Sequence, residues 1–243
     1  MSEPSLSVVV PVHNEQDNIA PLVGEIVAAL RGRVSFEIIH VDDASTDATV
    51  EALRAAMRVT PELRVIQHRQ QAGQSTAVRN GVKAARAPWI ATLDGDGQND
   101  PADIPKLLAA RDKAASQVKL FAGWRVNRRD SFNKRISSSI ANTVRSRLLR
   151  DATPDTGCGI KLFERATFLE LPYFDHMHRF LPALIHRAGW QTVSVPVNHR
   201  PRTAGISKYG MWNRLWVGIA DLRGVAWLAR RTRHTQTTEI TLP

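Results

Sequence analysis

The sequence predicts an α/β fold in which a mostly parallel sheet carries helices on both faces. Short β-branched runs alternate with amphipathic segments through the first half of the 243 residues, an order that links parallel strands through crossover helices. Several of these runs end in acidic or polar residues, where the ligand crevice of such sheets lies. Because no internal repeat or low-complexity linker is found, we expect one domain over residues 1–210 and an extension over residues 211–243.

The expected strands are apolar, mostly β-branched runs bounded by polar or turn residues. They cover residues 6–12, 36–41, 63–67, 89–93 and 191–197. The expected helices repeat apolar residues at helical spacing and cover residues 18–30, 47–57, 75–85, 101–115 and 179–188. Ser45 and Asp47 are expected to cap the second helix, and Pro101 suits the first turn of the fourth.

Two later segments are strongly basic. Residues 123–150 and residues 200–234 each contain eight Lys or Arg and a single acid. The first includes an expected basic helix over residues 136–149. The second includes residues 211–229, in which one helical stripe is formed by Trp212, Leu215, Trp216, Ile219, Leu222 and Ala226. That stripe is interpreted either as a core helix or as an amphipathic helix at a membrane interface. Residues 232–243 are expected to be a disordered tail.

Composition restricts the partners and the compartment. The formal net charge of +10 indicates either an anionic partner or a generally basic surface. Cys158 is the only cysteine, which excludes an intrachain disulfide and fits a reducing compartment. We expect neither a signal peptide nor a spanning helix, so the sequence predicts a cytoplasmic protein that is soluble or attached to a membrane surface.

The sharpest chemical motif is Asp94-Gly95-Asp96, which follows the fourth expected strand and is itself followed by Gln98. Two carboxylates this close are costly unless a positive charge compensates them, and a divalent cation held by oxygen ligands would do so. A solvated acidic turn is the alternative. The position after a buried strand of an α/β fold favours the metal site, for Mg²⁺ or Mn²⁺.

Polar residues also end the first two expected strands. Asp42 and Asp43 follow the second, and the segment from Pro11 to Glu15 follows the first. Acids at such ends hydrogen-bond ribose hydroxyls or bases in nucleotide-binding sheets, although capping and turn formation explain each one singly. The three strand ends together favour a nucleotide site. A GxGxxG motif after the first strand and a GxxxxGK[ST] motif are both absent from the sequence, which argues against dinucleotide hydride transfer and P-loop hydrolysis.

Eight segments of the sequence resemble those of a known family. The chain resembles family 2 glycosyltransferases of the GT-A fold, specifically the dolichol-phosphate mannosyltransferase type. The matching segments cover most of residues 6–212 in order: VVVPVHNE (8–15), IIHVDDASTDAT (38–49), GQSTAVRNG (73–81), TLDGDGQNDP (92–101), GWR (123–125), KRISSSIAN (134–142), DTGCGIKLF (155–163) and PRTAGISKYG (201–210).

The resemblance implies roles for particular residues. The nucleotide-sugar would be held by Pro11, His13, Glu15, Asp42, Asp43, Gln74, Asp94 and Lys208. A metal ion would be held by Asp94, Asp96 and Gln98, and the acceptor phosphate by Arg125, Arg135 and Ser139. Arg202 and Lys208 match a loop that closes over the diphosphate, and catalysis is assigned to Asp96, Arg125 and Arg202. His13 replaces the usual aromatic residue, and Gln74 replaces a common lysine.

The implied reaction is inverting transfer of a sugar from GDP-mannose or a UDP-sugar to a polyprenyl phosphate. A phosphate monoester is largely dianionic at neutral pH, with a second pKa of about 6, so no dedicated catalytic base is expected. The implied location is peripheral, on the cytoplasmic face of a membrane. A membrane-protein partner would then move the product across the bilayer.

Three other functions compete with this one. Transfer to a glycan or lipid hydroxyl would require an acidic base near the acceptor, and the QxxRW signature of processive polysaccharide synthases is absent from the sequence. A basic nucleic-acid-binding protein is disfavoured because few aromatic residues interleave with the basic segments, so no nucleic-acid partner is expected. A catalytically dead nucleotide-binding regulator is disfavoured because the acidic and basic motif residues are retained.

Overall fold

The computed structural model describes residues 3–126, 148–149, 153–198, 200 and 211–231. These residues build a seven-stranded sheet in the order β3-β2-β1-β4-β6-β5-β7. The strands are β1 (Leu6–Val12), β2 (Phe36–Asp42), β3 (Leu63–Gln67), β4 (Trp89–Thr92), β5 (Val118–Arg125), β6 (Lys161–Glu164) and β7 (Gln191–Val197). Within this sheet only β6 runs antiparallel to its neighbours. The predicted mostly parallel sheet is therefore confirmed.

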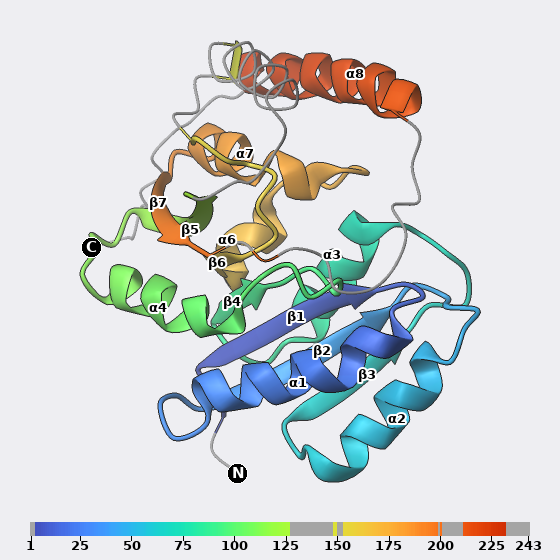
Figure 1. The fold of residues 1–243 in the computed structure, drawn as a ribbon. Coiled ribbons are helices and arrows are strands. Elements are labelled where there is room, and N and C mark those ends of the chain that lie inside the picture. The colour runs from blue at the N-terminus through green and yellow to red at the C-terminus, as the bar shows by residue number, and fades with distance from the viewer. Residues whose placement is uncertain (1–2, 127–147, 150–152, 199, 201–210, 232–243) are drawn as a thin grey trace, which may run out of the picture.

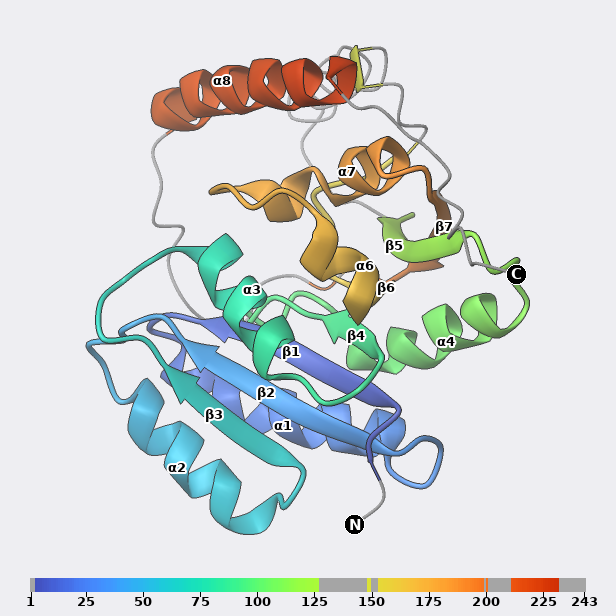
Figure 2. The ribbon, with the colours of Figure 1, turned by 180° about the vertical axis from the view of Figure 1, so that it is seen from behind.

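Helices cover both faces of the sheet, as predicted (Figures 1 and 2). One face packs against α1 (Gln16–Leu30), α2 (Thr49–Val59) and α4 (Ile104–Asp112), the last entered through the 3-10 turn η1 (Pro101–Asp103). The other face packs against α3 (Gln74–Ala84), α6 (Arg165–Glu170) and α7 (Leu181–Arg187). The last helix, α8 (Met211–Arg230), lies on the outer side of α7 (Figures 1 and 2).

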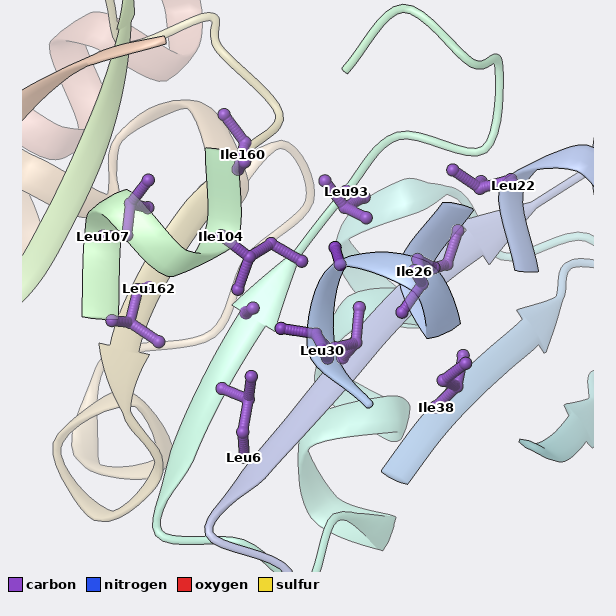
Figure 3. Close-up of a cluster of buried hydrophobic side chains, with 14 of the residues drawn as sticks. Leu6, Leu22, Ile26, Leu30, Ile38, Leu93, Ile104, Leu107, Ile160 and Leu162 are labelled. Atoms are coloured by element: carbon purple, nitrogen blue, oxygen red, sulfur yellow. The ribbon is translucent and has the colours of Figure 1, made fainter. Parts of the chain in front are cut away.

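One core cluster joins the two halves of the chain. Figure 3 shows Leu22, Ile26 and Leu30 of α1 lying over the first strands, with Ile104 of α4 and Leu162 of β6 in the same cluster. All five are at most 2% exposed, and burying such a side chain contributes roughly 1.5–3 kcal/mol. The late strand β6 is therefore fixed against the early part of the sheet by shared packing.

Most predicted elements are confirmed, and the exceptions have local causes. The strands β5 and β6 and the helix α6 were not predicted: β6 is only four residues long, and β5 runs into the basic segment. The expected helix over residues 101–115 is split into η1 and α4, and the one over 179–188 starts only at Leu181. Of the expected helix over 136–149, only residues 148–149 belong to the described residues. The expected tail over 232–243 lies outside them.

The expected caps of α2 act differently from the prediction. The N-cap position is Ala48, and Asp47 instead accepts hydrogen bonds from the backbone N–H and the hydroxyl of Thr49. Ser45 accepts from the backbone N–H of Asn14, so it ties the loop after β2 to the loop after β1. The prediction that Ser45 or Asp47 is the N-cap residue was wrong: Asp47 precedes the N-cap by one residue and bonds Thr49, and Ser45 bonds the loop after β1.

The C-terminal half of α8 packs on the rest of the protein. Val225 and Ala226 are buried in the same cluster as α7, and Arg187 Nε donates to the carbonyl of Leu228 at 3.1 Å. Trp227 points outward and is 57% exposed. This helix therefore has a core contact on one side and an exposed tryptophan on another. Among the described residues, no helix combines the length and the apolar content needed to cross a bilayer.

Candidate active site

A pocket of about 380 Å³ opens at the carboxyl ends of β1 and β4. Its walls come from these strand ends, the start of α3, the end of β5, the segment 155–161 and the turn before α7. The lining residues are Pro11, Gln74, Val78, Thr92, Leu93, Asp94, Arg125, Asp155, Thr156, Gly157, Cys158, Gly159, Lys161, His178, Arg179 and Leu181. This is the edge of an α/β sheet where ligands bind.

Asp94 lies in this pocket just beyond β4. Its backbone N–H donates to Asn99 Oδ1 at 2.8 Å, and its Oδ1 accepts from Gln74 Nε2 at 2.8 Å. Burial, together with the negative charge of Asp96, raises the pKa of the Asp94 carboxyl, while Lys161, Gln74 and Arg125 oppose this rise. Gln74 thus links the start of α3 to the acidic turn.

Two glycines allow the backbone to approach this turn closely. A Cβ on Gly159 would overlap the Asp94 carboxylate and the side-chain oxygen of Asn99. A Cβ on Gly95 would come within 2.8 Å of the carbonyl of Pro11. Thr92 Oγ1 donates to the carbonyl of Gly159 at 2.8 Å, which holds the segment 155–161 against β4. The acidic turn and this segment therefore fit each other without room for any side chain at residue 159.

The acidic turn fits a divalent cation. Asp94 and Asp96 flank Gly95, and the charge of Asp96 disfavours ionisation of Asp94, an effect that a bound cation would relieve. The backbone N–H of Gln98 donates to Asp96 Oδ1 at 3.1 Å, which tightens the turn. No cluster of three or more His, Cys, Asp or Glu suited to a metal occurs in the described part of the chain. Mg²⁺ is commonly bound by one or two carboxylates together with substrate phosphates, and two carboxylates in one turn fit that pattern.

The acids at the end of β2 are held by neighbouring loops. Asp43 accepts from the backbone N–H groups of Ala72 and Gly73, each at 2.8 Å, and from His68 Nδ1 at 2.7 Å. Asp42 accepts from the backbone N–H of Ser45 and from the side chain of Gln67. These bonds shape the loop that leads into α3, so the two carboxylates build the rim beside the pocket.

The residues after β1 join the same rim. His13 Nδ1–H donates to the carbonyl of Asp43 at 2.8 Å. The backbone N–H of Glu15 donates to Thr49 Oγ1, and Glu15 Oε2 accepts from the side chain of Asn18. The rim beside the pocket is thus formed by His13 and Glu15 after β1 and by Asp42 and Asp43 at the end of β2. Pro11 lines the pocket itself.

Arg125, at the end of β5, forms a two-point ion pair with Asp155. Its Nε lies 2.6 Å from Oδ2 and its Nη2 lies 2.8 Å from Oδ1. The side chains are 14% and 6% exposed, so the pair forms part of the pocket wall. Gly157 passes beside it, and a Cβ there would lie 3.5 Å from Nη2.

The structure brings together some predicted site residues and leaves others undescribed. Pro11, Gln74, Asp94 and Arg125 line one pocket, although β4 and β5 are separated in sequence. Asp96 and Gln98 lie in the adjoining turn. Arg135, Ser139, Arg202 and Lys208 lie outside the described residues.

Several pocket residues were not predicted as site residues. The buried Lys161, whose pKa is lowered by burial, donates from Nζ to the carbonyl of Cys158. Burial also raises the pKa of the Cys158 thiol. Asp155, His178 and Arg179 are further titratable side chains of the lining that were not predicted as site residues. Asp155 and Lys161 belong to the matched segment DTGCGIKLF, which could have indicated them; His178 and Arg179 stand outside every matched segment.

Comparison with known proteins identifies the family. The model of the family described as "Glycosyl transferase family 2" matches residues 7–171. The chain is 37% identical to dodecaprenyl-phosphate galacturonate synthase of Rhizobium johnstonii, over 93% of this chain and 67% of that protein. It is 32% identical to undecaprenyl-phosphate 4-deoxy-4-formamido-L-arabinose transferase of Edwardsiella ictaluri, over 85% of this chain and 63% of that protein. The chain thus spans about two thirds of the length of these relatives.

Solved structures show the same fold at lower identity. A mannosyltransferase of Pyrobaculum calidifontis, in complex with GDP-Man and Mn²⁺, matches with a TM-score of 0.66 and 20% identity, over 94% of this chain and 70% of that one. Glucosyl-3-phosphoglycerate synthase of Mycobacterium tuberculosis, in complex with Mg²⁺ and UDP, matches with a TM-score of 0.69 and 19% identity, over 93% of this chain and 79% of that one. The fold, the acidic turn at the strand ends and the family match agree: the chain belongs to glycosyl transferase family 2 and has the GT-A fold.

Proposed function

We propose that this protein transfers a sugar, with inversion, from a nucleotide-sugar to a polyprenyl phosphate. The observation that carries this proposal is the pocket in which Asp94 of the acidic turn, Gln74 of α3 and Arg125 of β5 meet. This pocket combines a cation site suited to the diphosphate of the donor with an arginine suited to the phosphate of the acceptor. The relatives named for dodecaprenyl-phosphate and undecaprenyl-phosphate transfer support the choice of acceptor.

The donor would lie across the ends of β1, β2 and β4. Pro11, His13, Glu15, Asp42 and Asp43 would border the nucleoside, and Gln74 and Asp94 the sugar phosphate, with Lys208 assigned to the diphosphate by resemblance. Asp94, Asp96 and Gln98 would hold Mg²⁺ or Mn²⁺. When bound, this cation would stabilise the negative charge of the departing nucleoside diphosphate. The donor sugar is left open between GDP-mannose and UDP-sugars.

The acceptor phosphate would approach from the Arg125 side. Arginine offers a planar fork to phosphate oxygens, and Asp155 fixes the plane of that fork. Because a phosphate monoester is already largely ionised at neutral pH, its oxygen can attack the anomeric carbon directly, from the face opposite the leaving group. Arg135 and Ser139 would share this phosphate, and Arg202 would stabilise the transition state. Catalysis then comes from positioning and charge stabilisation.

The described pocket wall does not favour a hydroxyl acceptor. Such an acceptor needs a general base to take up its proton, and burial lowers the pKa of the pocket residue His178 well below 6.5, which makes its imidazole a weak base. The two carboxylates that line the pocket are both engaged: Asp94 accepts from Gln74, and Asp155 is paired with Arg125. The phosphate acceptor removes the need for such a base.

The proposed location is the cytoplasmic face of a membrane. A polyprenyl phosphate presents its phosphate at headgroup depth, and the exposed Trp227 of α8 together with the net charge of +10 suits an anionic surface. A membrane-protein partner would move the glycosylated lipid onward.

Product analysis tests the proposal directly. The protein would be incubated with Mg²⁺ or Mn²⁺, a short polyprenyl phosphate and a panel of GDP- and UDP-sugars, and the lipid fraction analysed by mass spectrometry. We expect one glycosylated lipid phosphate and its loss when EDTA removes the cation. Formation of the same product in EDTA would reject the metal assignment, and absence of product with every donor would reject lipid-phosphate transfer.

A further inference from the structure

Arg179 is a charged group of the pocket wall without a charged partner among the described residues. The other cations of the lining are compensated: Arg125 is paired with Asp155, and the ammonium of Lys161 bonds the carbonyl of Cys158 within electrostatic range of Asp94 and Asp155. Arg179 is an exposed residue that lines the same pocket. Its guanidinium makes no hydrogen bond or ion pair within the described part of the chain. A bound anion would complete this arrangement of charges.

The position of Arg179 is fixed from the α3 side. It ends the 3-10 turn η2 (Met177–Arg179), which is anchored to α3 by Ser75. The backbone N–H of His178 donates to Ser75 Oγ at 3.3 Å, and Ser75 Oγ lies 2.7 Å from His178 Nδ1. Gln74, the neighbour of Ser75, donates to Asp94. Arg179 therefore borders the Gln74–Asp94 side of the pocket, which the proposed function assigns to the donor.

His178 adds a neutral donor beside this guanidinium. Burial, strengthened by the charges of Lys161 and Arg179, lowers the pKa of His178 well below 6.5, so the imidazole is uncharged at neutral pH. Ser75 Oγ accepts from the backbone of His178 and can donate its own proton to Nδ1, and in that tautomer the imidazole proton stays on Nε2. The pocket wall thus offers one planar cation and one neutral N–H group within electrostatic range of each other.

This pair matches a carboxylate better than a second phosphate. A guanidinium fork can bind either anion through two parallel hydrogen bonds, but one cation balances the single charge of a carboxylate and not the nearly double charge of a phosphate monoester. On the donor side the diphosphate is already assigned to the acidic turn and its cation. We propose that Arg179 and His178 form a subsite for a carboxylate carried by the donor sugar, so that the preferred donor is a nucleoside diphosphate hexuronate. This inference rests on the proposed donor side of the pocket.

Matched donors test the subsite. UDP-galacturonate and UDP-galactose differ only in carrying a carboxylate or a hydroxymethyl group, and GDP-mannuronate and GDP-mannose form a second pair. We expect the wild-type protein to prefer one uronate over its neutral partner in kcat/KM. Arg179→Ala should lower kcat/KM for that uronate about 10- to 100-fold, the range for loss of a charge-assisted pair, with a far smaller effect on the neutral sugar. Arg179→Lys should recover part of the loss, because lysine restores the charge without the fork.

Controls separate this subsite from other roles. Arg79→Ala removes a guanidinium that stacks 4.4 Å from the ring centre of Tyr173 outside the pocket lining, and it should leave the donor preference unchanged.

Calorimetric binding of each uronate and its neutral partner, with Mg²⁺ and without acceptor, measures the preference even if no transfer occurs. Such binding without product would reject the proposed function while supporting the subsite. Equal binding of both sugars by the wild type, or an Arg179→Ala defect confined to the KM for lipid phosphate, would overturn the subsite.

Discussion

Arg125 Nε and Nη2 each bond one oxygen of the Asp155 carboxylate, so the guanidinium is fixed in a single plane in the pocket wall. A flexible arginine loses much side-chain entropy when it binds a ligand. Asp155 removes part of that freedom before the ligand arrives. The pair thus fixes one edge of a phosphate site in advance.

Asp155→Asn is therefore expected to lower kcat/KM for polyprenyl phosphate by about 10-fold or more, since hydrogen bonds to charged groups each contribute about 1.5–3 kcal/mol. Steady-state kinetics with varied lipid phosphate measure the effect. Because Asp155 acts through Arg125, Asp155→Asn should add little to the loss that Arg125→Lys already causes. Glu62→Gln is the matched control, because it breaks the two-point pair with Arg31 on the exposed surface. Independent, additive losses from the two pocket substitutions would contradict the positioning role of Asp155.

Gly159→Ala is expected to abolish productive binding of the donor. Its methyl group would overlap the Asp94 carboxylate and Asn99, so the acidic turn or the segment 155–161 must move. Titration of Mn²⁺ in the presence of nucleoside diphosphate, followed by electron paramagnetic resonance, measures the effect without any turnover. Gly24→Ala in α1, where a Cβ meets nothing within 4 Å, is the control. An unchanged Mn²⁺ titration for Gly159→Ala would show that the close approach to Asp94 is unimportant for the cation site.

Arg200 connects three separate parts of the chain. Its guanidinium pairs with Glu25 of α1 at 2.8 Å and with Asp100 at 2.7 Å, and its backbone N–H donates to the carbonyl of Gln98. Arg200→Ala should weaken Mn²⁺-dependent binding of nucleoside diphosphate about 2- to 10-fold, the range for one or two lost hydrogen bonds. The melting temperature should change little, because such exposed pairs contribute about 0–1 kcal/mol. Arg31→Ala is the control. Loss of stability with unchanged nucleotide binding would reduce Arg200 to a structural contact.

His40 makes the stability of the protein depend on pH. It is fully buried in β2, and within the described residues neither ring nitrogen has a hydrogen-bond partner. Burial lowers the pKa of His40 from 6.5 to about 4. The unfolded chain therefore takes up a proton before the folded one as the pH falls, and stability present above pH 6.5 is lost progressively down to about pH 4.

The loss should approach about 3 kcal/mol, from 1.36 kcal/mol per pKa unit. Urea unfolding of the wild type and of His40→Leu at pH 7.5, 6 and 5 measures it. The substitution should remove part of the decline, and an identical decline in both proteins would show that other groups cause it.

The regular α/β part of the fold could be predicted from the sequence, whereas the composition of the pocket wall could not. The runs at residues 6–12, 63–67 and 191–197 are confirmed as β1, β3 and β7 with the same bounds, because β1 is a buried apolar run and β3 and β7 are short runs rich in β-branched residues. The antiparallel β6 leaves almost no such run, yet its insertion between β4 and β5 brings Lys161 next to the acidic turn.

The same limit applies to individual site residues. Asp94 could be predicted because two acids one residue apart after a buried strand are costly without a cation to compensate them. His178 and Arg179 could not, because a histidine and an arginine in a turn look like surface residues until the Ser75 contact places them in the pocket. Likewise, the roles of Asp43 and Asp47 in holding loops depend on backbone N–H groups that no side-chain pattern reveals.

The central claim is that the acceptor is a phosphate, and a comparison of two lipids tests it most directly. The protein would be given its best nucleotide-sugar, Mg²⁺ and either a short polyprenyl phosphate or the polyprenol of the same length, with the lipid product measured by mass spectrometry. We predict rapid transfer to the phosphate, none to the alcohol, and at least a 10-fold loss of phosphate transfer in Arg125→Ala, as expected for removal of a hydrogen bond to a charged group. Comparable transfer to the alcohol, or phosphate transfer untouched by Arg125→Ala, would contradict the account.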